Sequence, residues 1–520
     1  MDSLTDYQPN HHRDWPLGYA GHAALLLSSC MLAVALPSQA MAQALPQATP
    51  QTTPTATTSP ASLPSAPRPP VIEALERAKA ASARHASAQA AGTTALHLCS
   101  GYFNTEMPRP LVDDTARTSG FVLPAPGGTT MVDEQAKTVT VSYSDDMPPR
   151  MAVSRPLMGC TLLPIGAGKT MADALPRPTP AVAPRFDDKP WPMGDRAAVA
   201  KLPGKHKAAL ETLIDEAFKD EAGSYSGITW GIVVVKDGKI VAERYQHGHD
   251  MHIPARTYSM CKSLSGTLTG LGVQKGLLDI HRKGILAEWR RPGDPRGEIT
   301  LDNIMHLSSG LYTEAGGDRQ NEIYQSGATI TETAVANVVD SRPGTRFVYA
   351  GGDPILLARA LHEAVGDEQA WLTYPYRELL WKVGMTRTFI ETDINNDLIS
   401  SGQCWSTARD FGRLGLLYLG DGMWNGERIL PSGWSQYVAT PAPAQRPSRS
   451  ARNIRYGGQF WVYGGVDGLP DDAFSAVGAM GQYAMIVPSQ NLVVVRRGYD
   501  AAAGFKVSKF AADVIAALGK

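Results

Sequence analysis

The chain carries almost no net charge, and none of its segments is strongly basic. Its 520 residues include 49 Lys and Arg against 50 Asp and Glu, which gives a formal charge of −1 at pH 7. No run of clustered Lys and Arg marks a surface for nucleic acid. Hydrophobic residues make up 43% of the chain, enough for a sizeable core, and the length fits two or three domains. This balance is compatible with an enzyme that acts on small molecules.

Long apolar runs are also scarce. The apolar stretch Ala23–Leu36 is short for a membrane span and is followed by a proline. Ala40-Met41-Ala42 then offers a cleavage site, so residues 1–42 are typical of an export signal with a long, weakly basic start. Two alternatives stay open: Leu27–Cys30 resembles a lipoprotein box, and the stretch could remain as an anchor. We expect a periplasmic or secreted protein with no stable membrane span after cleavage.

Cysteine is rare, with five in the chain. Signal cleavage would remove Cys30 and place the other four in an oxidising compartment. Cys99 and Cys160 bracket one small segment, and we expect them to form a disulfide. Cys261 and Cys404 are expected to be small buried thiols. The alternative for Cys261 is a nucleophile, although no basic partner for it is evident in the sequence.

Several motifs of other enzyme classes are missing. No G-x-S-x-G nucleophile elbow occurs, which disfavours an α/β-hydrolase. Ala167–Thr170 ends like a phosphate-binding loop, but Leu163 stands where the first glycine is required. His247, His249 and His252 have no downstream Cys/His set, so a solvated loop is favoured over a metal site. We therefore expect no metal and no organic cofactor.

Changes in composition along the chain predict its organisation after the signal. Residues 43–95 are typical of a disordered linker followed by an Ala-rich helix. Residues 96–165 contain short β-rich runs and are expected to form a small β-rich module. Residues 166–203 are proline-rich and would be a second linker or a chain draped over the main domain. Residues 204–520 have the globular pattern of that main domain.

The main domain is expected to have strands at both ends and helices in the middle. Strand patterns occur at Ile228–Val235, Ile240–Tyr245, Gln482–Val487 and Leu492–Arg497. The first two flank an Asp-Gly turn that is typical of a hairpin. We expect an α/β (α+β) fold, in which one antiparallel sheet is flanked by helices and residues 285–440 form a helical lobe, with the site between sheet and lobe.

The tetrad Ser259-Met260-Cys261-Lys262 is the most informative motif. It opens a predicted helix, and residues i and i+3 share one helix face, so the serine hydroxyl and the lysine amine would lie about one turn apart. A neutral lysine can take the proton of a serine nucleophile, and burial would lower the pKa of Lys262 towards that state. The alternative is a capped helix start with a solvated lysine.

Four further motifs follow in an order that strengthens this hypothesis. The five are Tyr258–Ser263, Ile304–Leu311, Pro343–Tyr349, Trp405–Asp410 and Gly481–Tyr483. With them, residues 204–520 resemble the serine β-lactamase and penicillin-recognising superfamily. The likeness is to its class C-like branch, which contains esterases, D-aminopeptidases and 6-aminohexanoate-dimer hydrolases. The resemblance implies an α/β sandwich with an all-helical subdomain.

The resemblance also implies a role for each matching residue. Ser259 would be the acylated nucleophile and Lys262 the group that helps to deprotonate it. Tyr349 would share proton transfer with Lys262. The main-chain N–H groups of Ser259 and Gln482 would form the oxyanion hole, which stabilises charge that develops on the carbonyl oxygen.

Two motifs depart from the superfamily pattern. The second motif is usually Tyr-x-Asn, but Gly351 stands in place of the asparagine that contacts the substrate amide. The third is usually Lys-Thr-Gly or His-x-Gly, but Ala479 replaces its basic residue, and Gly481 ends the motif. We expect Ala479 and Gly481 on the third-motif strand. Both departures disfavour recognition of an anionic β-lactam.

The leading hypothesis is an exported serine hydrolase that cleaves a small amide or carboxylic ester through a Ser259 acyl-enzyme. An alternative within enzymes is a D-Ala-D-Ala-type peptidase or β-lactamase that acts in the cell envelope. An alternative from another class is a binding or sensing protein with weak turnover, which Gly351 and Ala479 favour. The expected partner is a small-molecule substrate and not a nucleic acid.

Overall fold

The structure is a computed structural model that describes most of the chain after residue 69. The described residues are 70–118, 128–179, 181–196, 199–313, 322–447, 453–500 and 504–519. The expected export signal, Cys30 and the start of the expected linker lie outside these residues. Among the described residues, we find no helix that combines the length and the apolar character needed to span a bilayer.

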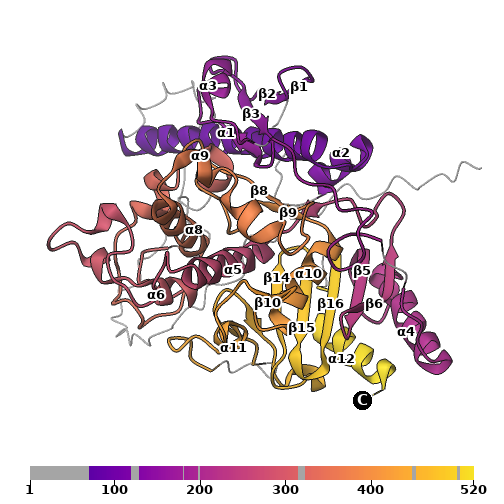
Figure 1. Ribbon diagram of the computed structural model, residues 1–520. Coiled ribbons are helices and arrows are strands. Elements are labelled where there is room, and N and C mark those ends of the chain that lie inside the picture. Colours follow the sequence, from indigo (N-terminus) through magenta and orange to yellow (C-terminus); the bar gives the residue numbers. More distant parts are fainter. Residues whose placement is uncertain are drawn as a thin grey trace, which may run out of the picture. The chain divides into compact units, whose positions relative to one another are not determined.

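Strands from both ends of the main domain form one antiparallel sheet (Figure 1). Its seven strands lie in the order β12-β13-β14-β15-β16-β5-β6. Strand β5 (Ile228–Lys236) pairs with β6 (Lys239–Tyr245) on one side and with β16 (Leu492–Tyr499) on the other. The remaining strands are β15 (Gln482–Val487), β14 (Phe474–Gly478), β13 (Trp461–Val462) and β12 (Arg455–Tyr456). The predicted sheet is therefore confirmed.

Helices cover both faces of this sheet. α5 (Cys261–Gln274) and α10 (Ala408–Leu419) pack on one face, and α4 (Gly204–Ala217) and α12 (Val507–Leu518) pack on the other. Alternate side chains of a strand point to opposite faces, and both faces here are buried. This explains why the central strands are rich in valine and isoleucine throughout, without polar residues in alternation.

The lobe between α5 and α10 is less helical than expected. It contains α6 (Leu301–Met305), α8 (Gly352–Val365) and α9 (Glu368–Trp371). Wide helical turns and loops join these helices, among them the turn Glu322–Ser326. A small sheet in the order β7-β9-β8 consists of β7 (Ala255–Arg256), β9 (Cys404–Ser406) and β8 (Phe389–Ile390). Shorter elements are β10 (Met423–Trp424), β11 (Glu427–Arg428) and α11 (Trp434–Ala439).

The N-terminal part of the described chain begins with two helices instead of strands. α1 (Pro70–Asn104) runs past the expected end of the Ala-rich helix, and α2 (Arg109–Thr118) follows it. Alanines and leucines after residue 87 continue the helical spacing and pack against the sheet, which favours helix over strand here. The four-stranded sheet consists of β1 (Thr130–Asp133), β2 (Thr138–Val141), β3 (Arg150–Arg155) and β4 (Gly159–Leu162).

The expected disulfide joins α1 to this small sheet. The Cα atoms of Cys99 and Cys160 are 6.1 Å apart, and both residues are fully buried. The N-terminal part is not a separate body, because Pro69–Lys520 form one compact unit. In Figure 1, α1 lies at the top of the view, beside the strand β3 that it contacts.

Residues 181–196 of the proline-rich segment lie against the main domain. The indole N–H of Trp191 donates to the carbonyl of Gly238, and the Arg413 guanidinium donates to the carbonyls of Pro192 and Gly194. The helix α3 (Lys169–Ala174) precedes this stretch. These contacts attach the segment to the hairpin β5–β6 and to α10.

Candidate active site

The turn Tyr258–Met260 carries the predicted nucleophile Ser259, and we call it the nucleophile turn. It lies between the two sheets of the main domain. Tyr258–Met260 form a short 3-10 turn that continues into α5. The N–H of Thr257 donates to the carbonyl of Cys404 on β9 at 2.8 Å. On the other side, Gly478 of β14 packs so tightly that an added Cβ would lie 2.1 Å from the Thr257 carbonyl oxygen. The turn is thus held from both sides, at the N-terminal end of a buried helix.

Lys262 is buried next to Ser259, as the tetrad spacing predicts. Its Nζ lies 3.4 Å from Ser259 Oγ and donates to the main-chain carbonyl of Ser401 at 2.9 Å. The residue is 4% exposed, and burial lowers the pKa of Lys262 to about 7. A substantial fraction of the amine is therefore neutral near pH 7 and able to accept a proton from the serine hydroxyl.

Tyr349 closes the group from the solvent side. Its phenol faces the Ser259 hydroxyl and the Trp461 indole, and Lys262 Nζ lies 5.0 Å from the centre of its ring. Burial raises the pKa of Tyr349, whereas the hydrogen bonds from Ser259 and Trp461 oppose that rise. The structure thus brings together the three residues for which the sequence predicts proton transfer.

An aromatic cluster surrounds Tyr349. Its ring centre lies 5.4 Å from that of Trp461 and 5.6 Å from that of Tyr456. Tyr456 is fully buried, whereas Tyr349 is 36% exposed, so the cluster fixes the ring on one side and leaves the other open.

The third motif lies in a turn and not on a strand, which corrects the expectation for Ala479 and Gly481. Both residues belong to the turn between β14 and β15, where Met480 and Gly481 adopt positive φ values of 58° and 79°. Left-handed backbone of this kind ends a strand. The strand segment that packs against the nucleophile turn is therefore the end of β14, at Gly478.

Gln482 lies at the start of β15, opposite Gly478 in the strand register. Its side chain is fully buried and donates to the carbonyls of Met480 and Gly498, while its oxygen accepts from Arg497. These contacts anchor the hairpin turn beside Ser259. The assignment of the Gln482 N–H to an oxyanion hole stays a prediction.

Cys261 and Cys404 form a disulfide instead of the two free thiols expected from the sequence. Their Cα atoms are 5.5 Å apart, and both residues are fully buried. Residues i and i+2 of a helix point in different directions, so Cys261 faces β9 and not the side of the helix that carries Ser259. The bond leaves no thiolate at this position and excludes Cys261 as a nucleophile.

Three residues around this group were not predicted from the sequence, namely Ser401, Tyr324 and Trp461. Ser401 supplies the carbonyl that holds the amine, and its hydroxyl shares a hydrogen bond of 2.5 Å with the phenol of Tyr324. Main-chain acceptors leave no signature in a sequence, and no spacing links residues 324 and 401. Trp461 was likewise not expected, since the tryptophans are scattered along the chain.

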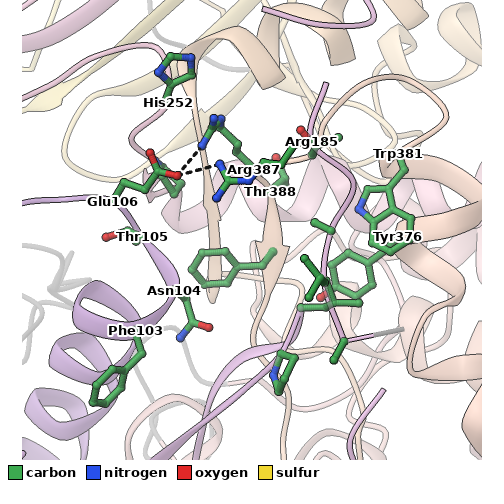
Figure 2. A pocket seen from close by; sticks show the side chains of 18 residues that line it. Phe103, Asn104, Thr105, Glu106, Arg185, His252, Tyr376, Trp381, Arg387 and Thr388 are labelled. Atoms are coloured by element: carbon green, nitrogen blue, oxygen red, sulfur yellow. Dashed lines mark hydrogen bonds and ion pairs between the residues drawn. The ribbon is translucent and has the colours of Figure 1, made fainter. Parts of the chain in front are cut away.

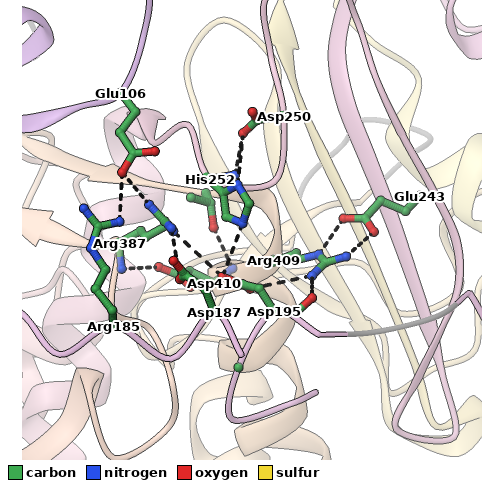
Figure 3. Close-up of polar contacts among 12 residues, drawn as sticks. Glu106, Arg185, Asp187, Asp195, Glu243, Asp250, His252, Arg387, Arg409 and Asp410 are labelled. Atoms are coloured by element: carbon green, nitrogen blue, oxygen red, sulfur yellow. Dashed lines mark hydrogen bonds and ion pairs between the residues drawn. The ribbon is translucent and has the colours of Figure 1, made fainter. Parts of the chain in front are cut away.

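A second group of titratable side chains lies away from Ser259 (Figure 3). Among the residues that the structure describes, Asp187, Asp195 and His252 are the ones close enough together to hold a metal ion. Arg413 pairs with Asp195 at 2.7 Å, and Arg387 pairs with Asp187 at 3.0 Å. Because guanidinium groups already neutralise these carboxylates, the cluster is a structural ion-pair network and a poor cation site.

A cavity of about 330 Å³ lies next to this network (Figure 2). Its lining comes from the end of α1, the proline-rich segment and β8, and none of the residues predicted for catalysis contributes to it. Arg185 and Arg387 both reach Glu106, at 2.8 and 3.0 Å, so the charges at its wall are paired within the protein. The cavity is separate from the Ser259 group.

A comparison with family models assigns most of the main domain to one family. A family model described as β-lactamase matches residues 214–496, more than half of the chain. The chain belongs to the β-lactamase family. The matched region includes Ser259, Lys262 and Tyr349, whereas α1 and the small N-terminal sheet precede it. No curated protein matches the chain.

Several solved structures resemble the chain at low identity. A Bacillus anthracis protein assigned as a 6-aminohexanoate-dimer hydrolase is 21% identical, with a TM-score of 0.47 over 66% of this chain and 87% of that one. A Bacteroides dorei protein assigned as a β-lactamase is 20% identical, with a TM-score of 0.46 over 59% and 96%. A family VIII carboxylesterase is 12% identical, with a TM-score of 0.47 over 61% and 98%.

Proposed function

We propose that this β-lactamase-family protein is a serine hydrolase that cleaves a small amide or carboxylic ester through an acyl-enzyme on Ser259. One observation carries the proposal: a buried lysine amine, with its pKa lowered to about 7, lies 3.4 Å from Ser259 Oγ. A solvated lysine at a helix start would keep its proton at neutral pH and could not act as a base.

The contacts among Ser259, Lys262 and Tyr349 suit a two-step acyl transfer. Lys262 takes the proton of Ser259 as Oγ attacks the carbonyl carbon, and the carbonyl electrons move to its oxygen. When the tetrahedral intermediate collapses, the proton passes through Lys262 and Tyr349 to the leaving alcohol or amine. Water then attacks the Ser259 ester with the same groups as base, and the acid is released. The Ser259 N–H and, as predicted, the Gln482 N–H would stabilise the oxyanion.

Two side chains of the superfamily pattern, a carboxamide and a cation, are missing near Ser259, and their absence bears on the substrate class. Gly351 directly precedes α8 and carries no carboxamide, and Ala479 provides no cation in the turn beside the nucleophile. A β-lactam carries a carboxylate that commonly requires such a cation. We therefore favour linear amides of the 6-aminohexanoate type, or carboxylic esters, over β-lactams.

The two disulfides support an exported protein. Buried disulfides persist in oxidising compartments and are rare in the cytosol. Both bonds lie in the interior, one in the N-terminal part and one beside the nucleophile. Together with the sequence of residues 1–42, they support a periplasmic or secreted location.

The test compares purified protein with Ser259→Ala on p-nitrophenyl acetate, p-nitrophenyl butyrate, the linear 6-aminohexanoate dimer and nitrocefin. We expect turnover of an ester or of the linear amide that the variant lacks, and a fluorophosphonate adduct on Ser259 by mass spectrometry. Efficient nitrocefin turnover without the others would instead indicate a β-lactamase. Absence of both turnover and adduct would overturn the proposal and indicate a binding protein.

A further inference from the structure

Tyr324 connects the N-terminal part of the chain to the group around Lys262. Its phenol bonds to Ser401 Oγ at 2.5 Å, and the main-chain carbonyl of the same serine accepts from Lys262 at 2.9 Å. The main-chain carbonyl of Tyr324 accepts from the Gln403 side chain at 3.2 Å. Its ring lies over Gly402, where a Cβ would be 3.7 Å from the ring edge. Tyr324 therefore contacts three consecutive residues of the segment that holds the lysine.

The turn that carries Tyr324 rests on one face of α1. Gln89 Nε2 donates to Glu322 Oε1 at 3.2 Å and to Ser326 Oγ at 3.3 Å, so it joins the first and last residues of the turn. His85, one helical turn earlier on α1, contacts the same Glu322 oxygen at 2.5 Å. These contacts fix the position of the turn on α1 at its first and last residues.

Gly92 allows α1 to approach this turn closely. A Cβ at Gly92 would lie 2.4 Å from the Gln325 carbonyl oxygen and 2.8 Å from Arg150 Nη1. The buried Arg150 guanidinium donates to the carbonyls of Ala88, Gln325 and Leu163, which ties helix, turn and strand together. Glycine costs helix stability relative to alanine, so its presence inside α1 is explained by this contact.

We propose that the N-terminal part, residues 70–163, is a component of the hydrolase site, in which α1 fixes Tyr324 and Tyr324 positions the Ser401 carbonyl that holds Lys262. The proposal rests on the hydrolase function proposed above. It assigns a role to a part of the chain that lies before the region of the family match. Tyr324 is a positioning residue in this scheme, and α1 acts on Lys262 only through Tyr324 and Ser401.

The chemistry of Tyr324 agrees with positioning and not with proton transfer. Burial raises the pKa of Tyr324 to about 12, so its phenol keeps its proton throughout the neutral range. A phenol that stays protonated cannot serve as a base, whereas its hydrogen bond with the Ser401 hydroxyl can hold that residue in place. Loosening this bond would let residues 401–403 move and admit water to Lys262. Water reduces the desolvation that lowers the pKa of Lys262, so the pKa would rise.

The decisive variant is Gly92→Ala. Alanine has a higher helix propensity than glycine, so α1 itself should not be weakened, but its Cβ would displace the Gln325 carbonyl. Gly204→Ala is the matched control, since a Cβ there meets nothing within 4 Å. Tyr324→Phe is the second variant and removes only the hydroxyl. For both Gly92→Ala and Tyr324→Phe we expect kcat to fall about 10- to 100-fold with KM within about 2-fold, as for a misplaced catalytic group. The acid limb of the pH profile of kcat/KM should move to higher pH.

Hydrogen exchange provides a readout that does not depend on turnover. In Gly92→Ala, peptides that cover residues 399–405 should exchange faster than in wild type and in Gly204→Ala. Unchanged exchange there, or a wild-type kcat and pH profile in either variant, overturns the positioning proposal. A wild-type protein without turnover overturns the hydrolase function instead, and exchange then still decides whether α1 holds residues 401–403. Thermal unfolding of each variant confirms that the measured protein is folded.

Discussion

Cys261 is bonded to Cys404, three residues after the carbonyl that holds the Lys262 amine. Across the same two segments, the Thr257 N–H donates to the Cys404 carbonyl. The nucleophile turn and the lysine acceptor therefore belong to one cross-linked unit. The disulfide therefore opposes any movement of α5 relative to β9 that would separate the Lys262 amine from the Ser401 carbonyl.

Removal of this disulfide should weaken both stability and catalysis. The bond joins residues 143 positions apart, and a disulfide that closes a loop of that size contributes about 2–5 kcal/mol to the free energy of unfolding. In the double variant Cys261→Ala/Cys404→Ala we expect the urea midpoint to fall and kcat to drop several-fold. Cys99→Ala/Cys160→Ala is the matched control, with lower stability and a smaller loss of kcat. A double variant at 261 and 404 with wild-type kcat would show that packing alone fixes the lysine.

The lowered pKa of Lys262 predicts a pH-dependent stability. The unfolded chain keeps a proton on this lysine up to about pH 10.4, whereas the folded protein loses it near pH 7. The unfolded state thus binds more protons between these values, so the free energy of unfolding rises with pH through that window. Lys262→Met should be inactive and should lack this pH-dependent contribution to stability. The free energy of unfolding of the variant, relative to that of the wild type, should therefore be higher at pH 7 than at pH 9.5.

Urea unfolding at pH 7 and pH 9.5 measures the effect. Lys205→Met, which removes an exposed lysine on α4, is the control and should keep the wild-type change with pH. If Lys262→Met and Lys205→Met show the same change, the lysine is not buried in its neutral form. Activity provides a second measure, because the acid limb of kcat/KM should lie near pH 7 in the wild type.

Tyr349→Phe should lower kcat about 100-fold, the scale of a lost proton-transfer group, with a small change in KM. Trp461→Phe keeps an aromatic ring but removes the indole N–H that reaches the phenol, so a smaller, several-fold loss is expected. Steady-state kinetics on the best ester or amide compare the two. Equal losses in both variants would indicate that the aromatic packing matters and the proton transfer does not.

Gly478→Ala tests the close contact between β14 and the nucleophile turn. An added Cβ would lie 2.1 Å from the Thr257 carbonyl oxygen, so the turn must move. We expect kcat to fall at least about 100-fold, since a misplacement of about 1 Å at a reacting group costs that much. Gly504→Ala, where a Cβ meets nothing within 4 Å, should be neutral. Fluorophosphonate labelling of Ser259 at a wild-type rate in Gly478→Ala would contradict this expectation.

The sequence predicts those parts of the fold and site that depend on local spacing. The Asp237-Gly238 hairpin, the strands β15 and β16 and the i, i+3 pair Ser259 and Lys262 follow from periodicity and turn chemistry. The resemblance to the superfamily also implies that Tyr349 works with Ser259 and Lys262, and the structure brings the three residues together.

Features that depend on long-range contacts were missed. The partner of Cys261 is 143 residues away, and nothing in local spacing connects the two cysteines. The carbonyl of Ser401 acts through its main chain, so any residue type could supply it. Ala479 lies in a turn and not in the expected strand, because Met480 adopts left-handed backbone. A methionine side chain gives no indication in the sequence that its residue will adopt this conformation.

The close contact between α1 and the turn Glu322–Ser326 bears on where this chain can be divided. Residues 214–496 match the family model, yet Gln89 and Gly92 lie outside them and contact that turn directly. A fragment that begins at residue 204 would lack both contacts, and it would also lack the Arg150 guanidinium that bonds to the Gln325 carbonyl. The boundary of the family match is therefore not the boundary of the compact unit, which begins at Pro69.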